Sequence, residues 1–131
     1  AQAILIRLRT DLTQVLDAVA RETLGEIGLE WSADASACVV AAAKGYPGKP
    51  DTGAVIHGLD AAAKHVNVQV FHAGTGRDAD GNFVTAGGRV LGITSTGPDL
   101  ADALRNSYAA INDISWEGMH FRRDIGKTTG N

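Results

Sequence analysis

The feature that most constrains the fold is a series of short strand-forming segments after residue 36, each bounded by turn-forming residues. Residues 66–70 alternate strictly between apolar and polar side chains, as a half-buried strand does. The run 37–43 is apolar throughout and predicts a buried strand, and two further strands are predicted at 82–85 and 89–94. Short strands between turn signals favour an antiparallel sheet.

Two turns connect these segments. A long hairpin is expected from Val68 to Ile93, with a polar inner loop at 74–81 that contains the reversal dipeptide Asp80-Gly81. A second, tight reversal is expected in residues 84–94, where two glycines and an arginine separate two strand-forming runs.

A helix is predicted to follow the last strand. Gly97-Pro98-Asp99 is a typical helix start, and the apolar residues that follow recur at helical spacing. We expect the helix to run from Asp99 to Asn112 and to bury Leu100, Leu104 and Ile111 against one face of the sheet. The predicted fold class is therefore α+β, an antiparallel β-sheet with a packed helix.

The first 30 residues differ from the rest. Asp11 and Gln14 form a capping pair ahead of apolar residues at helical spacing, which predicts a helix from Asp11 to Leu24 that ends at Gly25 and Gly28. We expect residues 1–30 to belong to another unit and residues 31–131 to form the compact domain. The polar tail at 122–131 is expected to be frayed.

Composition excludes several classes of function. A chain of 131 residues buries about two thirds of its unfolded surface. A formal charge of −3 and 5% aromatic residues argue against nucleic acid and membrane partners. Cys38 is the single cysteine and is expected to be an unreactive core residue, which suits a reducing cytoplasm. The chain starts at Ala1 without a signal-peptide pattern, so we expect a piece of a longer protein.

Two loops are candidates for binding a ligand. Gly87-Gly88-Arg89 combines backbone amides that can approach an anion closely with a guanidinium that matches phosphate or carboxylate oxygens. The alternative is a tight turn with a solvated arginine. The loop around Tyr46, Pro47 and Gly48 follows a predicted strand and supplies donors on a stiff backbone, although a plain surface connection is the default.

Other chemistry-bearing residues are expected to be structural. The four histidines are dispersed, so no metal site is predicted, and His72 is expected to be a hydrogen-bond partner. Arg122-Arg123-Asp124 could clamp an anion, but the adjacent carboxylate favours a local salt bridge. No catalytic residues and no nucleotide-binding motif are identified.

Five phrases together resemble one family. They are "GYPG" (45–48), "VFHAGT" (70–75), "GGRVLGIT" (87–94), "SYAAI" (107–111) and "FRRDIG" (121–126). Their order and spacing are similar to the C-terminal domain of phosphoribosylamine-glycine ligases, also called glycinamide ribonucleotide synthetases. The resemblance extends over nearly the whole chain.

The resemblance implies an ATP-grasp ligase of de novo purine biosynthesis, which joins glycine to 5-phosphoribosylamine and releases ADP and phosphate. It implies a barrel-sandwich or single-hybrid-like C-terminal domain at 31–131, preceded by the last helix of the ATP-grasp domain at 1–30. ATP and Mg²⁺ (or Mn²⁺) are then cofactors of the complete enzyme, none is bound by this chain, and the chain is inactive without the other domains.

The resemblance also implies a phosphate-binding role for Gly87, Gly88 and Arg89, and substrate contacts for Tyr46, Pro47 and Gly48. Two alternatives use no catalysis. A small carrier domain would need a lysine at an exposed hairpin tip, where this sequence has Arg77, Asp78, Asp80 and Arg89 instead. A purely structural interaction module would show no affinity for anions.

Overall fold

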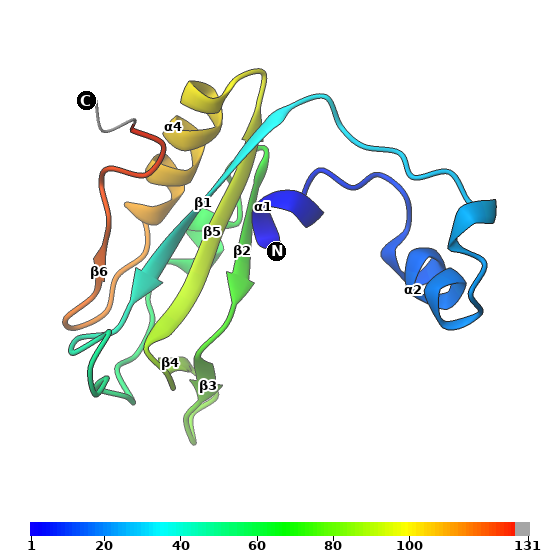
Figure 1. Cartoon of the computed structure of the whole chain (residues 1–131). Helices are drawn as coiled ribbons and strands as arrows, with labels where there is room; N and C mark the ends of the chain where they lie inside the picture. Colours follow the sequence, from blue (N-terminus) through cyan, green and yellow to red (C-terminus); the bar gives the residue numbers. More distant parts are fainter. Residues whose placement is uncertain (128–131) are drawn as a thin grey trace.

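The computed structural model describes residues 1–127, and its centre is a four-stranded antiparallel sheet (Figure 1). The strand order is β2 (Val68–His72), β5 (Arg89–Gly97), β1 (Ala35–Ala42) and β6 (His120–Phe121). β1 and β5 are the two long central strands, and they pair along their whole length. The predicted antiparallel sheet is confirmed.

A second sheet of two strands, β3 (Thr75–Arg77) and β4 (Phe83–Thr85), extends one end of the β2–β5 pair. β2 pairs with β5 at Val70 and Ile93, so the predicted long hairpin is confirmed. At its tip the Asp78 amide donates to the Asn82 carbonyl over 3.0 Å. The Asn82 side chain and nearby amides donate to the Asp78 carboxylate, which lowers its pKa.

The expected tight reversal at 84–94 is wrong. β4 pairs with β3, whereas β5 pairs with β1 and β2, so residues 86–88 form a corner on one arm of the long hairpin. Gly74 on the other arm is hydrogen-bonded to both ends of this corner. Its carbonyl accepts from the Ala86 amide over 2.7 Å, and its amide donates to the Arg89 carbonyl over 2.9 Å. Gly87 and Gly88 do not adopt positive φ. Close backbone approach, not a turn conformation, explains the glycines here.

The helix α4 (Leu100–Ile111) covers one face of β1 and β5 (Figure 1). Asp99 caps its first turn, because its carboxylate accepts from the Asp102 amide over 2.8 Å. The residues that face the sheet are Ala103, Ser107, Ala110 and Ile111, all fully buried. Small residues along this face bring the helix backbone close to the sheet.

The predicted burial of α4 is correct for Ile111 and wrong for Leu100, which is 45% exposed. Leu104 is half-buried. Both leucines lie beside Gly126 of the C-terminal segment instead of facing the sheet. Helical spacing predicts that these apolar residues lie along one side of the helix. It does not predict which part of that side packs against the sheet, as Ile111 does.

The core lies between the sheet, α4 and the segments at the lower end of the domain, including the short α3 (Leu59–Ala62). Its central residues are apolar and almost completely inaccessible: Val39, Ala41, Ala43, Ile56, Ala62, Val90, Leu91, Ile93, Ala110, Ile111, Ile114 and Trp116.

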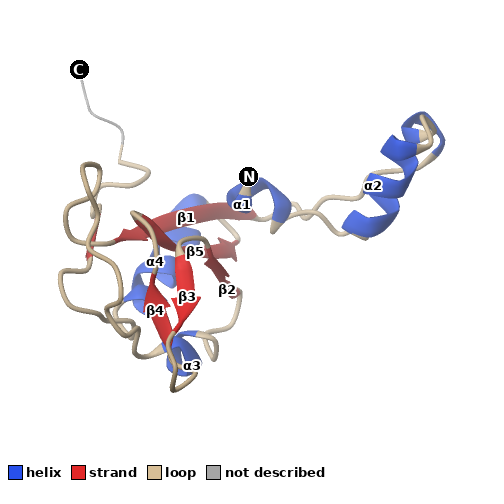
Figure 2. Ribbon diagram, turned by 90° about the horizontal axis from the view of Figure 1, so that it is seen from below, coloured by secondary structure: helices blue, strands red, loops and turns tan. Residues whose placement is uncertain are grey.

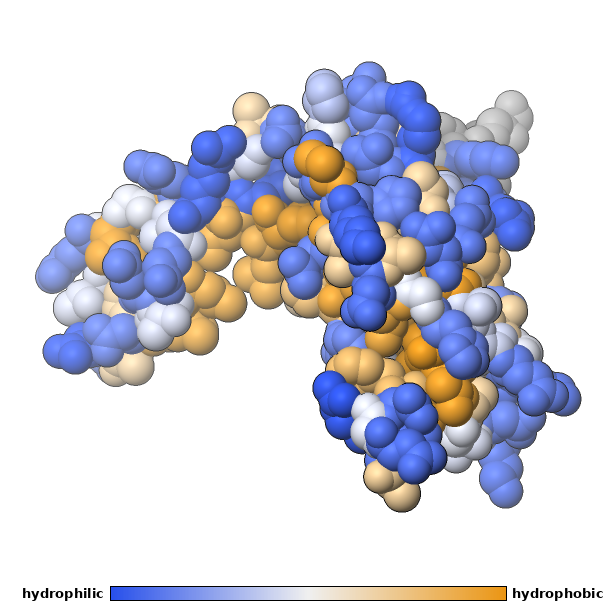
Figure 3. Space-filling view, turned by 180° about the vertical axis from the view of Figure 1, so that it is seen from behind, coloured by the Kyte–Doolittle hydropathy of each residue, from blue (hydrophilic) through white to orange (hydrophobic). Residues whose placement is uncertain are grey.

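The N-terminal residues form an arm that projects from the domain (Figure 2). α1 (Gln2–Leu5) lies beside the sheet, where its Ala3 carbonyl accepts from the Ser36 hydroxyl, and α2 (Leu12–Ala20) lies farther out. A 3₁₀ turn, η1 (Leu24–Glu26), follows α2. Apolar side chains gather along the concave side of the arm, seen from behind in Figure 3.

The predicted arm helix exists but is shorter than expected. Asp11 caps it by accepting from the Thr13 amide over 2.7 Å, which also lowers the pKa of Asp11. The helix ends near Arg21 rather than at Leu24, because Glu22 takes a left-handed φ of 59° and the Thr23 amide turns back to Ala18. A left-handed non-glycine residue ends a helix without leaving a glycine signal in the sequence.

The division into units at 1–30 and 31–131 stays a prediction. Of the tail expected to be frayed, residues 128–131 lie outside the described residues. No helix within residues 1–127 is long and apolar enough to cross a membrane.

The burial pattern of α4 predicts a clear difference between two substitutions. Ile111→Ala empties a fully buried site and should lower the free energy of unfolding by about 2–5 kcal/mol. Leu100→Ala removes a side chain that is 45% exposed and should cost under about 1 kcal/mol. Urea denaturation of the two variants measures both values. Equal costs would contradict the orientation of α4.

Candidate functional site

The two faces of β1 have different roles. Ala37, Val39 and Ala41 are buried on the face that α4 covers. Their neighbours Cys38, Val40 and Ala42 point to the opposite face, where they line a hollow. Cys38 is therefore half-buried at a surface, and its expected place in the core is wrong. The error arises because residues 37–43 are all apolar, so the sequence does not show which of them point to each face of the strand.

A β-bulge directs Arg89 to this second face. Leu91 pairs with Ala41, but the next pair is Arg89 with Ala42, so Val90 is an extra residue in β5. Strict alternation would place Arg89 on the same side as Leu91, facing the core. The bulge shifts the phase by one residue, and Arg89 joins Ala42 in the lining of the hollow.

The loop after β1 forms one wall of a cleft. It is closed by hydrogen bonds from the Tyr46 amide to the Ala43 carbonyl (3.1 Å) and from the Asp51 amide to the Lys44 carbonyl (2.8 Å). Gly45 has a φ of 87°, and a Cβ there would overlap the Lys49 carbonyl oxygen. The bond between Tyr46 and Pro47 is cis. A short, internally bonded loop holds Tyr46, which is 38% exposed, in place.

The corner at 86–88 forms the other wall and is joined directly to the loop. The Ala43 amide donates to the Gly88 carbonyl over 2.8 Å. The Tyr46 ring lies so close to Gly88 that a Cβ at residue 88 would overlap it. Gly88 is thus needed for contact with an aromatic ring from a loop more than 40 positions earlier in the chain.

The cleft between these walls has a volume of about 640 Å³. Five of the six predicted site residues line it, namely Tyr46, Pro47, Gly48, Gly88 and Arg89. Gly87 does not line it and instead packs against Gly74. The sequence analysis did not single out seven other lining residues, Gln2, Val40, Pro50, Ala73, Gly74, Leu91 and Gly92. Val40 and Gly92 lie in predicted strands and Gly74 begins the predicted inner loop, but these are signals of a strand or a turn and not of a binding site.

A smaller hollow of about 360 Å³ adjoins the cleft and shares Val40, Tyr46, Pro47 and Arg89 with it. Its own lining is mostly apolar and comes from β1, β6 and the segment after β6. Arg89 therefore stands at the boundary between the two spaces.

Arg89 lines the cleft as an unpaired cation. Its side chain is exposed and has no hydrogen-bond or ion-pair partner among residues 1–127. Arg122, which lines the smaller hollow, is held by Asp124 through Nε to Oδ1 at 2.9 Å and Nη2 to Oδ2 at 2.7 Å. The predicted local salt bridge at Arg122 and Asp124 is confirmed.

None of the four histidines lines the cleft, although His120 lines the smaller hollow. His72 shares a hydrogen bond of 3.0 Å between Nδ1 and the Thr75 hydroxyl, so it is a hydrogen-bond partner as predicted. His65 pairs with Asp113 at 2.7 Å on the other side of the domain. Within the described part of the chain, no three His, Cys, Asp or Glu side chains form a group that could hold a metal ion.

Comparison with known proteins places this architecture in a family. Residues 36–128 match the family model described as phosphoribosylglycinamide synthetase, C domain. The chain belongs to this family.

Relatives match over most of this chain but over a small part of their own length. The chloroplastic phosphoribosylamine–glycine ligase of Arabidopsis thaliana is 45% identical over 95% of this chain and 24% of that protein. The ligase of Phenylobacterium zucineum is 48% identical over 95% of this chain and 30% of its own. The crystal structure of the Thermotoga maritima ligase superposes with a TM-score of 0.67 at 32% identity, covering 83% of this chain and 26% of that one. The chain thus spans about a quarter to a third of these relatives.

The contact between Tyr46 and Gly88 predicts the effect of one methyl group. Gly88→Ala should displace the Tyr46 ring and lower the free energy of unfolding by about 1–3 kcal/mol, as overpacking does. Gly25→Ala is the matched control, because a Cβ there has no neighbour within 4 Å. Denaturant unfolding compares the two variants, and an unchanged stability of Gly88→Ala would contradict the close contact.

Proposed function

We propose that this chain is the C-terminal part of an ATP-dependent ligase that joins glycine to 5-phosphoribosylamine in de novo purine biosynthesis. Membership of the synthetase C-domain family and the names of the relatives support the proposal. ATP and Mg²⁺ (or Mn²⁺) belong to the complete enzyme, and we assign them to its other parts.

The cleft is proposed to receive the 5-phosphate of phosphoribosylamine. The observation that carries this assignment is the exposed, unpaired guanidinium of Arg89 at the cleft, beside the backbone of Gly88. Within residues 1–127 the amide of Gly88, which lines the cleft, has no hydrogen-bond partner and is available as a donor, whereas Gly87 lies outside the cleft. Backbone N–H groups and a forked cation are the donors that a phosphate dianion requires. Tyr46, Pro47 and Gly48 form the facing wall.

The partners of the chain are then the remaining domains of the ligase. The arm supports this, because Leu16, Val19 and Leu24 are exposed apolar residues without a covering surface in residues 1–127.

The cytoplasm remains the expected location on the basis of cysteine usage, and one relative is named chloroplastic. No observation favours the carrier or the structural module.

Arg89 provides the test of the phosphate site. In the complete ligase, Arg89→Lys keeps the charge but loses the fork, and Arg89→Ala loses both. kcat/KM for phosphoribosylamine should fall about tenfold or more for alanine and less for lysine, the scale of a hydrogen bond to a charged group. Steady-state kinetics at saturating ATP and glycine measure the change.

Arg105→Ala is the matched control for this experiment. Arg105 is an exposed arginine on α4, paired with Asp102 and outside the cleft. Its removal should leave kcat/KM unchanged. Full activity of Arg89→Ala would refute the phosphate assignment.

The chain by itself should not release ADP in the presence of ATP, glycine and phosphoribosylamine. Phosphoryl transfer requires a nucleotide and metal clamp that we assign to other parts of the ligase. A coupled ADP assay on the purified chain, with the complete ligase as the positive control, checks this expectation. Glycine-dependent ADP release by the chain alone would contradict the division of roles.

A further inference from the structure

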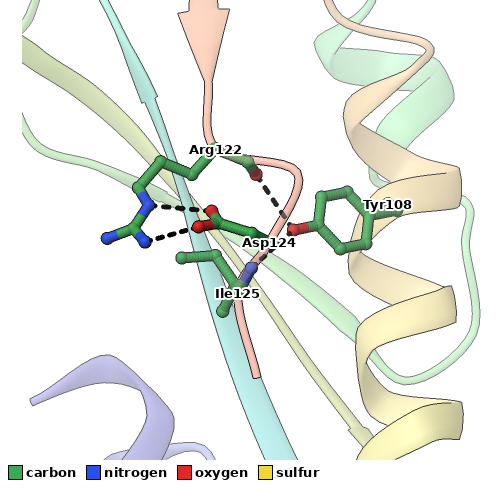
Figure 4. Close-up of polar contacts among 4 residues, drawn as sticks. All are labelled: Tyr108, Arg122, Asp124 and Ile125. Atoms are coloured by element: carbon green, nitrogen blue, oxygen red, sulfur yellow. Dashed lines mark hydrogen bonds and ion pairs between the residues drawn. The ribbon is translucent and has the colours of Figure 1, made fainter. Parts of the chain in front are cut away.

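The turn after β6 is clamped to α4 by one hydroxyl group. Tyr108 of α4 donates its hydroxyl hydrogen to the Arg122 carbonyl over 2.9 Å, and the same oxygen accepts from the Ile125 amide over 3.3 Å. Figure 4 shows Tyr108 on one side of the turn and the Arg122 guanidinium on the other. The hydroxyl therefore fixes the backbone from which Arg122 extends.

Asp124 fixes the side chain of Arg122. Its carboxylate engages Nε and Nη2 in a two-point contact (Figure 4). The hydrogen bond and the charge of Asp124 raise the pKa of Arg122, and the same contact lowers the pKa of Asp124. Both side chains are largely exposed, so such a pair contributes little to stability. Its clearer effect is to hold the guanidinium in one orientation.

This orientation leaves one edge of Arg122 free. A guanidinium has five N–H groups, and Asp124 takes one from Nε and one from Nη2. Both hydrogens of Nη1 and one of Nη2 remain, and Nη1 has no partner among the described residues. The Nη1–Nη2 edge is a fork that matches two oxygens of a phosphate or carboxylate.

Arg122, the residue with this free edge, lies at the same hollow as Arg89. Both arginines line the smaller hollow, which joins the cleft at Tyr46 and Pro47. The neighbouring Arg123 lines neither space and stacks instead on the Phe121 ring, with 4.7 Å from its Cζ to the ring centroid. Of the two consecutive arginines, only Arg122 faces the candidate site.

We infer that Arg122 is a second phosphate-binding arginine, which contacts the same substrate phosphate as Arg89, and that Asp124 and Tyr108 are positioning residues for it. The inference rests on the proposed function. A phosphate monoester carries close to two negative charges and three acceptor oxygens, more than one guanidinium can satisfy. A second fork, already oriented before substrate arrives, meets the remaining need without an ordering cost on binding.

The test uses the complete ligase with Arg122→Gln, Arg122→Lys and the control Arg123→Gln. Arg122→Gln should raise KM for phosphoribosylamine about tenfold, the scale of a lost charged hydrogen bond, with KM for ATP unchanged. Arg122→Lys should give a smaller rise and Arg123→Gln none. The inhibition constant of inorganic phosphate, competing with phosphoribosylamine, should rise in parallel with KM.

Two further variants test the shared phosphate and the positioning role. In Arg89→Ala/Arg122→Gln the combined rise in KM should be smaller than the product of the single rises, because the two residues act on one group. A full product would overturn the shared contact. Tyr108→Phe should raise KM for phosphoribosylamine at unchanged kcat. A fall in melting temperature with unchanged KM would reduce Tyr108 to a purely structural residue.

The outcomes separate this inference from the proposed function. If the Arg89 variants are impaired and Arg122→Gln is not, Arg122 is no phosphate ligand and the proposed site stands. If Arg122→Gln and Arg123→Gln are equally impaired, the effect is general surface charge and the inference fails. If Arg89→Ala and Arg122→Gln both behave as wild type, the phosphate site itself is wrong.

Discussion

The pairing of β1 with β5 is the interaction on which the rest of the domain depends. Its register, from Ala35 opposite Gly97 to Ala42 opposite Arg89, decides which side chains lie under α4 and which line the cleft. On the α4 side, β5 is joined to the helix by buried hydroxyls, because the Ser95 and Ser107 hydroxyl oxygens lie 2.7 Å apart. One extra residue near the end of this ladder then reverses the direction of Arg89. A strand pair whose one face packs against α4 thereby presents a cationic side chain to the cleft on its other face.

The sequence predicts the elements of this fold better than their relative orientation. Asp99 identifies the start of α4 correctly because capping is a local interaction. The corner at Gly87 and Gly88 is mistaken for a reversal because paired glycines serve a tight turn and a close backbone approach equally well. The bulge at Val90 depends on pairing with a strand distant in sequence, so no local pattern predicts that Arg89 leaves the core face.

The same distinction applies to the candidate site. The resemblance to the ligase family brings the two loops of the site into one hypothesis, and the structure places Tyr46 against Gly88. It also separates the arginines by environment: Arg89 is unpaired, Arg122 is held by Asp124, and Arg123 is stacked on Phe121. Identical side chains thus have different surroundings, which only their three-dimensional neighbours reveal.

The arm has a consequence for how stability is distributed along the chain. α2 has nine residues, is capped by Asp11 and keeps much of its apolar surface exposed, and a helix of that length is marginal without tertiary packing. Its amides should therefore exchange with solvent through local opening, whereas those of β1 and β5 are protected until the sheet unfolds globally. Native-state hydrogen exchange would resolve two cooperative units that differ widely in their free energy of opening. Covering the arm with another domain would merge its opening with that of its new neighbour.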